Sequence, residues 1–352
     1  WSWKDGRSRW DLLDVVRLKR ALRPEGINWP LDDKGEPSNR LELITSANGI
    51  AHENAHDALA DVTALIAVTK LIKQKQPQLY DYLLKMRDKK VVQQLVNVDD
   101  KKPFVYASGR YDKEFAKTTV AFPLTTSRNG GVVVYDLRYD PTPFVGLSAE
   151  ELAKKIFASW EERQAEDFVK LPVKELQYNR CPAVAPLGVL EQGDGWRKIS
   201  LSAEAIQKHQ NILLNHPDFA EKLRGIFENK PAFKKLPDPE AQLYDGFLND
   251  RDRLRVEAVR NADERELADF HPEFQDERLT PLLLHYKARN FLRSLSEDDL
   301  VQWEAWRAQH LQAQLPQFMV SLQRLASTAT DEQQFILQEL QLWAEAVLPG
   351  SD

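Results

Sequence analysis

The sequence of 352 residues contains one cysteine and no long apolar run. The single cysteine, Cys181, excludes an internal disulfide and any zinc or iron–sulfur site that needs several thiolates. No stretch approaches about 18 consecutive apolar residues, which excludes a transmembrane helix. The first residues, WSWKDGRSRWDLLD, also lack the basic stretch and apolar core of a signal peptide. We therefore expect a cytoplasmic protein that does not associate with membranes.

A starting methionine is also absent, because the chain begins at Trp1. An amphipathic pattern is already under way by Trp10, with no capped opening element before it. We therefore expect a fragment or a processed chain. The length corresponds to two or three domains of ordinary size, and 42% hydrophobic and 29% charged residues are typical of a globular protein.

Acidic residues outnumber basic ones in the chain as a whole, with 54 Asp and Glu against 48 Lys and Arg. The net charge of −6 and the pI near 5.8 argue against a nucleic-acid-binding protein. The charge is unevenly distributed, however, because the segment Lys70–Arg128 carries 13 Lys and Arg against 6 Asp and Glu. Binding to a polyanion depends on this local field rather than on the net charge. The segment is therefore either a solvated lysine-rich face or a surface that binds DNA.

Hydrophobic periodicity predicts helices over 9–23, 41–47, 57–75 and 79–86. The segment 57–75 carries two adjacent apolar stripes, which predicts a helix that packs on more than one side. Short runs rich in Val, Phe, Tyr and Thr then predict strands in KPFVYASG, TTVAFPLTT and GGVVVYDL, with a hairpin turn at 129–131. The segment LPVKELQYNRCPAVAP predicts more strand, which its prolines confine to sheet edges and strand ends.

Helical periodicity dominates the rest of the chain. It covers 150–166, 202–228, 282–292, 298–311, 317–325 and 331–347. These patterns predict an α+β multidomain fold, with a mixed domain around a small β core over 77–232 and an all-helical domain over 233–352. The segment 231–240 is the best linker candidate. We expect Trp303, Trp306 and Trp343 to pack together in the helical domain.

The best candidates for catalytic or metal-binding residues lie in the segment NGIAHENAHDALADV, residues 48–62. Its residues His52-Glu53-Asn54-Ala55-His56 match H-E-x-x-H, which on a helix places two imidazoles on one face to bind zinc. The context disfavours a zinc protease, because Asn48-Gly49 interrupts the helical pattern upstream and no third ligand stands out downstream.

A second interpretation pairs His56 with Asp61 at the start of the helix predicted over 57–75. If His56 lies in the preceding loop, the two side chains can converge. The imidazole could then deprotonate a water that a carboxylate-bound Mg²⁺ has acidified, which phosphodiester hydrolysis requires. The alternative is that His56 only caps the helix and Asp61 is solvated.

A resemblance favours the second interpretation. HDALADV resembles the third motif of the DEDD-type 3′→5′ exonucleases, in the variant where a histidine precedes the last aspartate. The segments SRWDLLD, ALRPEGINWP, ANGI, NAHDALADV, YNRCPAVAP, AQLYDGF and LLLHYKARNF together resemble bacterial exodeoxyribonuclease I. They are spread from residue 8 to residue 291, so the resemblance covers nearly the whole chain.

The resemblance implies a Mg²⁺-dependent enzyme that degrades single-stranded DNA from its 3′ end and releases mononucleotides. It implies that 1–76 is the C-terminal part of a ribonuclease H-like exonuclease domain, that 77–232 is an SH3-like β domain with helical insertions, and that 233–352 is the helical C-terminal domain. His56 would be the general base, and Asp61 would be a metal-binding carboxylate.

The family's site also needs an Asp-x-Glu and a further Asp, which belong to a segment before Trp1. One carboxylate and one histidine cannot hold two Mg²⁺ ions about 4 Å apart. We therefore expect this chain to be inactive alone. The alternative is a non-catalytic module that binds single-stranded DNA and a partner.

The family also binds the acidic C-terminal tail of single-stranded DNA-binding protein. Arg23 and Tyr82 match family positions that line this site, and an arginine there would bind the terminal carboxylate of the tail. Arg9 and Trp10 lie near the active-site half and are candidates for DNA contact. Tyr106 and Tyr111, which lie among lysines, either stack on DNA bases or pack in the β core. The family further implies a monomer.

Overall fold

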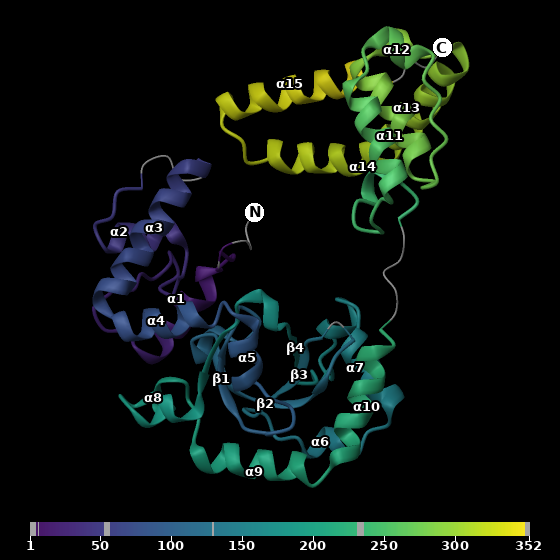
Figure 1. Cartoon of the computed structure of the whole chain (residues 1–352). Coiled ribbons are helices and arrows are strands. Elements are labelled where there is room, and N and C mark those ends of the chain that lie inside the picture. Colours follow the sequence, from purple (N-terminus) through teal and green to yellow (C-terminus); the bar gives the residue numbers. More distant parts are fainter. Residues whose placement is uncertain (1–4, 6, 53–56, 129, 231–235, 349–352) are drawn as a thin grey trace. The chain divides into compact units, whose positions relative to one another are not determined.

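The structure, a computed structural model, describes residues 5, 7–52, 57–128, 130–230 and 236–348. The chain folds into two compact units, Trp1–Pro231 and Ala232–Asp352 (Figure 1). Within the described part of the chain, no helix is both long enough and apolar enough to cross a membrane. The predicted division of the first unit at residue 76 stays a prediction.

Five helices open the first unit. Their N-terminal caps are mostly aspartates, since the side chains of Asp11, Asp57 and Asp88 accept hydrogen bonds from backbone N–H groups of the first turn. The bounds of the first four helices were predicted within a few residues, and the fifth, Lys89–Leu95, was not predicted. The helices are α1 (Leu12–Leu22), α2 (Leu41–Ala47), α3 (Ala58–Lys75), α4 (Pro77–Lys85) and α5 (Lys89–Leu95).

Helix α3 is buried on one side only, and the prediction that it packs on more than one side is wrong for the described residues. Ala64, Val68 and Ile72 form the buried stripe. The second apolar stripe lies in solvent, with exposed fractions of 73% for Leu59, 53% for Val62, 38% for Leu65 and 51% for Ile66. The wide apolar arc was recognised correctly, but no described element covers its second half.

The β core is a five-stranded antiparallel sheet in the order β4-β3-β2-β1-β5. The strands are β1 (Phe104–Ala107), β2 (Thr118–Thr126), β3 (Val132–Asp136), β4 (Val173–Leu176) and β5 (Ala183–Pro186). The segment with prolines forms β4 and β5, which are the two edge strands, as predicted. Pro123 lies in the inner strand β2, at a register shift where its missing N–H is tolerated.

Both faces of the sheet are covered, because side chains alternate along each strand. One face presents Val120, Phe122 and Tyr135 to residues of α1, α7, α9 and α10. The other face presents Ala121 and Val134 to residues of α5 and to Met86. The near-continuous apolar strands therefore follow from a sheet that is buried on two sides.

Short helices complete the first unit. The predicted helical segment 202–228 is divided by Pro217 into two helices, and 150–166 is helical only at its start. The helices are α6 (Thr142–Val145), α7 (Ala149–Phe157), α8 (Gly195–Lys198), α9 (Ala203–Leu214) and α10 (Pro217–Glu228). Figure 1 shows α9 and α10 passing beside the sheet.

The second unit is helical, as predicted. It contains α11 (Asp250–Asn261), α12 (Glu264–Ala268), α13 (Leu279–Asn290), α14 (Glu297–Ala326) and α15 (Asp331–Val347). The two helices predicted over 298–311 and 317–325 are wrong, because α14 is one helix that continues through Pro316. A proline inside a helix removes one hydrogen bond but need not end it when packing holds both sides.

The predicted tryptophan cluster is correct in part. Trp303 and Trp306 stack with ring centroids 5.2 Å apart, and His285 and His310 pack against Trp306 at 4.1 and 4.9 Å. Trp343, whose side chain is 60% exposed, makes no ring contact with them among the described residues. The prediction that Trp343 packs with the other two tryptophans is therefore wrong, because its side chain faces solvent.

Asp136, at the end of β3, gives the first unit a dependence on pH. Its buried carboxylate accepts hydrogen bonds from the Thr119 hydroxyl and from the Arg138 N–H. Burial raises its pKa to about 6 from an ordinary value of 3.8. The folded state therefore binds a proton that the unfolded state has lost between about pH 4 and pH 6, and stability falls as the pH rises through this window.

Asp136→Asn should remove this loss, because an amide oxygen can still accept both hydrogen bonds and carries no charge. We expect the variant to gain roughly 2–3 kcal/mol relative to wild type between pH 4 and pH 7, from about 1.4 kcal/mol per pKa unit. Urea unfolding at both pH values measures the difference.

Asp140→Asn is the matched control. Hydrogen bonds from Thr142 lower the pKa of Asp140, so its stabilisation is lost as the pH falls, and a shift of the same sign in both variants would contradict the assignment.

Candidate active site and partner-binding residues

Asp61 and His52 form the polar centre of the segment that carries the nuclease-like motif. The Nε2 of His52 donates to the Oδ1 of Asp61 at 2.9 Å. The imidazole is buried, with 5% of its side chain exposed, whereas the Asp61 side chain is 43% exposed at the start of α3. The sequence analysis considered His52 only as a possible zinc ligand. The contact was missed because the nine-residue spacing between His52 and Asp61 matches neither helical nor strand periodicity.

The loop that carries His52 is fixed to its surroundings at its start. Asn48 donates to the carbonyl oxygens of Asn28 and Ile44, and its own side-chain oxygen accepts from the Asn28 N–H at 2.9 Å. Gly49 then adopts a φ of +64°, which favours glycine. Beneath the loop, Ile44 of α2 packs in one apolar cluster with Val68 of α3.

His56 lies outside the described residues, so its distance to Asp61 stays a prediction. The position of His52, which would be the first zinc ligand of a zinc protease, does not support that interpretation. His52 precedes α3 and is not helical, and its two ring nitrogens lie beside Asp61 and at 3.3 Å from the hydroxyl of Thr45. An imidazole with both nitrogens engaged has no lone pair directed at a metal.

A magnesium ion would find part of a site here. The Asp61 carboxylate is half exposed and offers the oxygen ligand that Mg²⁺ prefers. Among the described residues, no group of three or more His, Cys, Asp or Glu side chains could hold a metal. The described residues therefore fit one ligand of a magnesium site and do not fit a complete site.

Arg23, the first predicted partner-binding residue, follows the end of α1. Its guanidinium donates to the carbonyl oxygens of Leu22 and Val189 at 2.8 and 3.1 Å, and more weakly to Gln192. All these acceptors are neutral, and no ion pair between Arg23 and an acidic side chain occurs among the described residues. The positive charge of Arg23 is thus held in place and not neutralised by an adjacent carboxylate.

Lys19 shapes the backbone that presents Arg23. Its fully buried ammonium donates to the carbonyl oxygens of Arg23 and Glu25 at 2.7 and 2.9 Å. These bonds satisfy carbonyl groups beyond the end of α1. Burial lowers the pKa of Lys19 to about 8, and the nearby Glu25 partly opposes that shift.

The other predicted contact residues have structural partners. Tyr82 is largely buried, donates to the Val184 carbonyl oxygen at 3.2 Å, and has a pKa that burial raises to about 12. Trp10 packs edge-on against Tyr80 at 5.6 Å. Arg9 is exposed, and its carbonyl oxygen accepts from the thiol of Cys181, which is buried. The roles of Arg9, Trp10 and Tyr82 in binding stay predictions.

Tyr106 and Tyr111 pack in the β core, which was one of the two interpretations. Their rings meet edge-to-face at 5.5 Å on the sheet face covered by α5. The ammonium of Lys174 lies 4.2 Å from the centre of the Tyr106 ring, and burial lowers the Lys174 pKa to about 8. Most cations of Lys70–Arg128, by contrast, are exposed.

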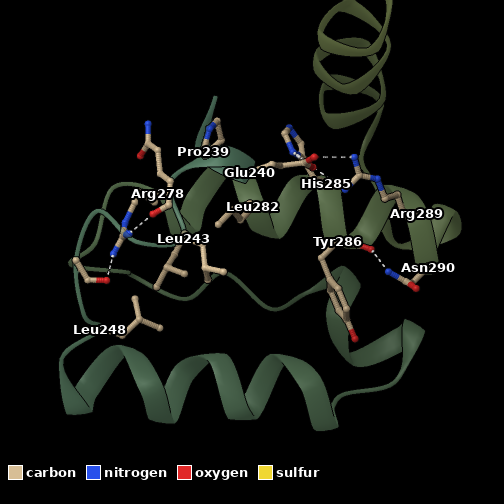
Figure 2. A pocket seen from close by; sticks show the side chains of 13 residues that line it. Pro239, Glu240, Leu243, Leu248, Arg278, Leu282, His285, Tyr286, Arg289 and Asn290 are labelled. Atoms are coloured by element: carbon tan, nitrogen blue, oxygen red, sulfur yellow. Dashed lines mark hydrogen bonds and ion pairs between the residues drawn. The ribbon is translucent and has the colours of Figure 1, made fainter. Parts of the chain in front are cut away.

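A pocket of about 590 Å³ lies in the second unit, between α13 and the segment 239–248 (Figure 2). Arg278 donates to the carbonyl oxygens of Gln242 and Gly246 at 2.7 and 3.2 Å, which holds this segment. Two aromatic side chains of the segment, Tyr244 and Phe247, are 93% and 97% exposed. Such exposed rings are typical of interaction sites.

Two family models match consecutive parts of the chain. The model of the exonuclease I SH3-like domain matches residues 87–229, and the model of the exonuclease I C-terminal domain matches residues 237–347. The first match contains the whole five-stranded sheet, and the second contains α11 to α15.

Relatives extend the similarity to the first residues. Exodeoxyribonuclease I of Haemophilus influenzae is 36% identical over 345 residues, which are 97% of this chain and 72% of the relative. A solved structure of Escherichia coli exonuclease I with a dA16 oligonucleotide has a TM-score of 0.85 and 35% identity, covering 99% of this chain and 75% of that chain. A structure of SSB/exonuclease I with the inhibitor CFAM has a TM-score of 0.79 and 33% identity, covering 99% and 74%.

Proposed function

The chain belongs to the exodeoxyribonuclease I family, and we propose that it is part of a 3′→5′ exonuclease that hydrolyses single-stranded DNA to mononucleotides. The observation that carries this proposal is the similarity, over nearly the whole chain, to an exonuclease solved with an oligonucleotide. The fold is exonuclease I-like, with an SH3-like and a C-terminal domain. We propose that residues 1–76 belong to a ribonuclease H-like exonuclease domain.

His56 and Asp61 have separate roles in this proposal. Asp61 would hold one of two Mg²⁺ ions, which polarise the phosphate and acidify a water when bound. His56 would accept the proton of the attacking water. The water oxygen would bond to phosphorus as the bond to the 3′ oxygen breaks, and that oxygen would take a proton from solvent water. The partial exposure of Asp61 supports this assignment, because a substrate end could reach it.

The site is incomplete among the described residues, and we propose that the chain alone does not hydrolyse DNA. One carboxylate cannot replace the set of acidic ligands that the family uses. The same observation favours the second candidate function, a module that binds single-stranded DNA and a partner without catalysis. The two candidates share a DNA-binding surface and differ only in hydrolysis.

Single-stranded DNA would be bound by cations and exposed rings. The basic segment Lys70–Arg128 supplies a local positive field, and most of its cations are exposed. Phe247 and Tyr244 offer ring faces on which unpaired bases could stack. Each feature, taken within its own unit, supports binding of a single strand without reading its sequence.

Phe247→Ala should weaken the binding of a single strand. We expect a rise in Kd of about 5- to 150-fold, from roughly 1–3 kcal/mol for each base that stacks on an aromatic ring. Fluorescence anisotropy with a labelled oligodeoxythymidine of about 16 nucleotides, without divalent metal, measures it.

Trp160→Ala is the matched control, because Trp160 is also an exposed aromatic, at 72%, but lies beside Glu161 and Glu162. It should leave the Kd unchanged. Equal losses in both variants would show that any exposed ring contributes, and no loss in either would remove the stacking surface from the proposal.

The proposed partner is the acidic C-terminal tail of single-stranded DNA-binding protein. A related structure is described as SSB/exonuclease I, which supports this class of partner. Arg23 is a suitable receptor for a terminal carboxylate, since its charge is fixed by neutral acceptors. A peptide with an amidated end distinguishes carboxylate recognition from general charge attraction.

A further inference from the structure

Three cations from separate elements of the first unit converge on Gly109, in the turn after β1. The guanidinium of Arg17, on α1, lies so close that a Cβ on Gly109 would be 2.9 Å from both of its Nη atoms. Lys117, just before β2, donates to the Gly109 carbonyl oxygen at 3.3 Å. Lys174 of β4 donates to the hydroxyl of the preceding residue, Ser108. The fold therefore gathers three positive charges at one turn.

The ammonium of Lys174 lies beside two aromatic rings rather than beside a carboxylate. Its nitrogen is 4.2 Å from the centre of the Tyr106 ring and 5.3 Å from that of Tyr111. In the part of the chain that the structure describes, no carboxylate lies within ion-pair distance of it. Burial lowers its pKa to about 8, and the more distant Asp14 opposes that shift only in part. A partly buried charge without a charged partner is costly, so an anion beside Lys174 would be stabilised.

Arg17 has more donors than acceptors. A guanidinium offers five N–H groups, and Nη1 of Arg17 donates to Asp14 at 2.5 Å. Among the residues that the structure describes, the buried Nε of Arg17 has no hydrogen-bond partner. Buried polar atoms of this kind are rare in folded proteins, and a bound water or ion is one way in which they are satisfied. Arg17 is therefore suited to receive an anion.

Positive charge exceeds negative charge around this turn. Arg110 faces Lys174, and Lys170 faces Lys117, so two further cations add to the local field. Asp112 opposes the charge of Lys117. The field attracts anions in general, and the arrangement of the donors determines which anion fits.

We propose that Arg17, Lys117 and Lys174 bind a phosphate group. A phosphate presents several oxygen acceptors in different directions, which suits a guanidinium and two ammonium groups from three elements. The group belongs either to the DNA backbone, in which case the proposal deepens the proposed function and rests on it, or to free phosphate or a mononucleotide. A backbone contact of this kind positions a strand without reading its bases. Neither Arg17 nor Lys174 lies in the basic segment Lys70–Arg128.

Three variants remove one cation each. Lys174→Met keeps the length of the side chain beside the rings, and Arg17→Gln keeps an N–H donor. Lys117→Gln changes a partly exposed side chain, so it tests the site even if one of the other variants does not fold. Lys154→Met is the matched control, because Lys154 is 74% exposed and pairs with Glu150 on α7. Thermal unfolding shows which variants are folded.

Binding of a labelled oligodeoxythymidine of about 16 nucleotides, without divalent metal and at several NaCl concentrations, tests the DNA backbone as the source. We expect each of the three variants to raise the Kd about tenfold at pH 7. Each should also reduce the slope of log K against log salt by about 0.7, which corresponds to one phosphate on a single strand. Because the cations share that phosphate, combining Lys174→Met with Arg17→Gln should reduce the slope no further.

The pH gives a second readout for Lys174. Its pKa of about 8 means that wild type loses this ammonium at high pH. The ratio of the Kd of Lys174→Met to that of wild type should therefore fall from about ten at pH 7 toward one by pH 9.5.

Titration with inorganic phosphate and with dTMP, at constant ionic strength, tests the free source. The amide signal of Gly109 in ¹⁵N-labelled protein reports occupancy. A saturable shift that Lys174→Met abolishes assigns the site to free phosphate groups. Loss of affinity confined to the oligonucleotide assigns it to the DNA backbone.

Unchanged Kd and salt slope in all three variants, with no saturable shift, overturn the phosphate site, while DNA binding by wild type leaves the proposed function intact. Equal losses in Lys154→Met and Lys174→Met indicate general charge attraction and also overturn the site. If wild type does not bind the oligonucleotide, the DNA-binding part of the proposed function is wrong, and the titrations with phosphate and dTMP alone decide the site.

Discussion

Purified alone, the 352-residue chain should leave a 5′-labelled single strand intact in the presence of Mg²⁺. In the proposed function, hydrolysis uses a pair of Mg²⁺ ions held by several carboxylates, and the described residues contain no group of three or more His, Cys, Asp or Glu that could hold a metal. Loss of essential groups of a catalytic unit typically lowers kcat by 10³-fold or more. We therefore expect a rate at least about 1,000-fold below that of a chain completed with an N-terminal segment that carries Asp-x-Glu.

The nuclease activity of a fusion protein is the decisive comparison for the activity of this chain. A fusion of this chain to the corresponding N-terminal segment of a relative should produce a ladder of shortened products from the 3′ end. Asp61→Asn in the fusion should remove that activity, whereas Asp57→Asn, which alters only the helix cap, should not. Brisk degradation by the unfused chain that Asp61→Asn abolishes would show that its own residues suffice, and the proposal of an incomplete site would be wrong.

Much of the fold could be predicted because local signals and tertiary packing agree. The prolines near Val173 and Ala183 exclude the middle of a sheet, and these segments form its two edges. Helix α15 has the predicted bounds, since Thr330 caps it with a reciprocal bond to Gln333. Capping and turn chemistry act within a few residues, so the sequence alone reveals them.

Other features depend on what lies across the fold. Pro316 gives a strong local signal for a helix end, but α14 continues through it. Trp343 is large and apolar, yet it lies on an uncovered face. The second stripe of α3 shows the same limit, because periodicity reveals an apolar surface and does not reveal which element covers it.

The candidate site was predicted as a segment rather than as a set of contacts. Asp61 lies in the first turn of α3, and its role and that of His56 stay predictions. The contact of His52 with Asp61 was not predicted, because the two residues are nine positions apart and their spacing matches no regular element. Arg23 was found by resemblance, and its neutral acceptors from 189–192 lie far away in the sequence.

Arg23→Ala should weaken binding of an acidic tail peptide by roughly 1.5–3 kcal/mol, which is about 10- to 150-fold in Kd. Among the residues that the structure describes, the Arg23 guanidinium binds only neutral oxygens, so its charge remains to pair with a terminal carboxylate. A lysine ammonium cannot reproduce the bonds to Leu22 and Val189 that hold the charge in place, so Arg23→Lys should recover only part of the loss. Isothermal titration calorimetry with the peptide at low salt measures each Kd.

Loss of the bonds that Arg23 makes to the 187–192 turn could also lower affinity by disturbing the surface. Gln192→Ala removes one of these acceptors and leaves the charge, so it should cost little. The amidated peptide completes a double-mutant cycle. If Arg23 binds the carboxylate, Arg23→Ala has almost no effect on the amidated peptide. An equal loss with both peptides would mean that Arg23 acts through the shape of the turn, and the carboxylate contact would be excluded.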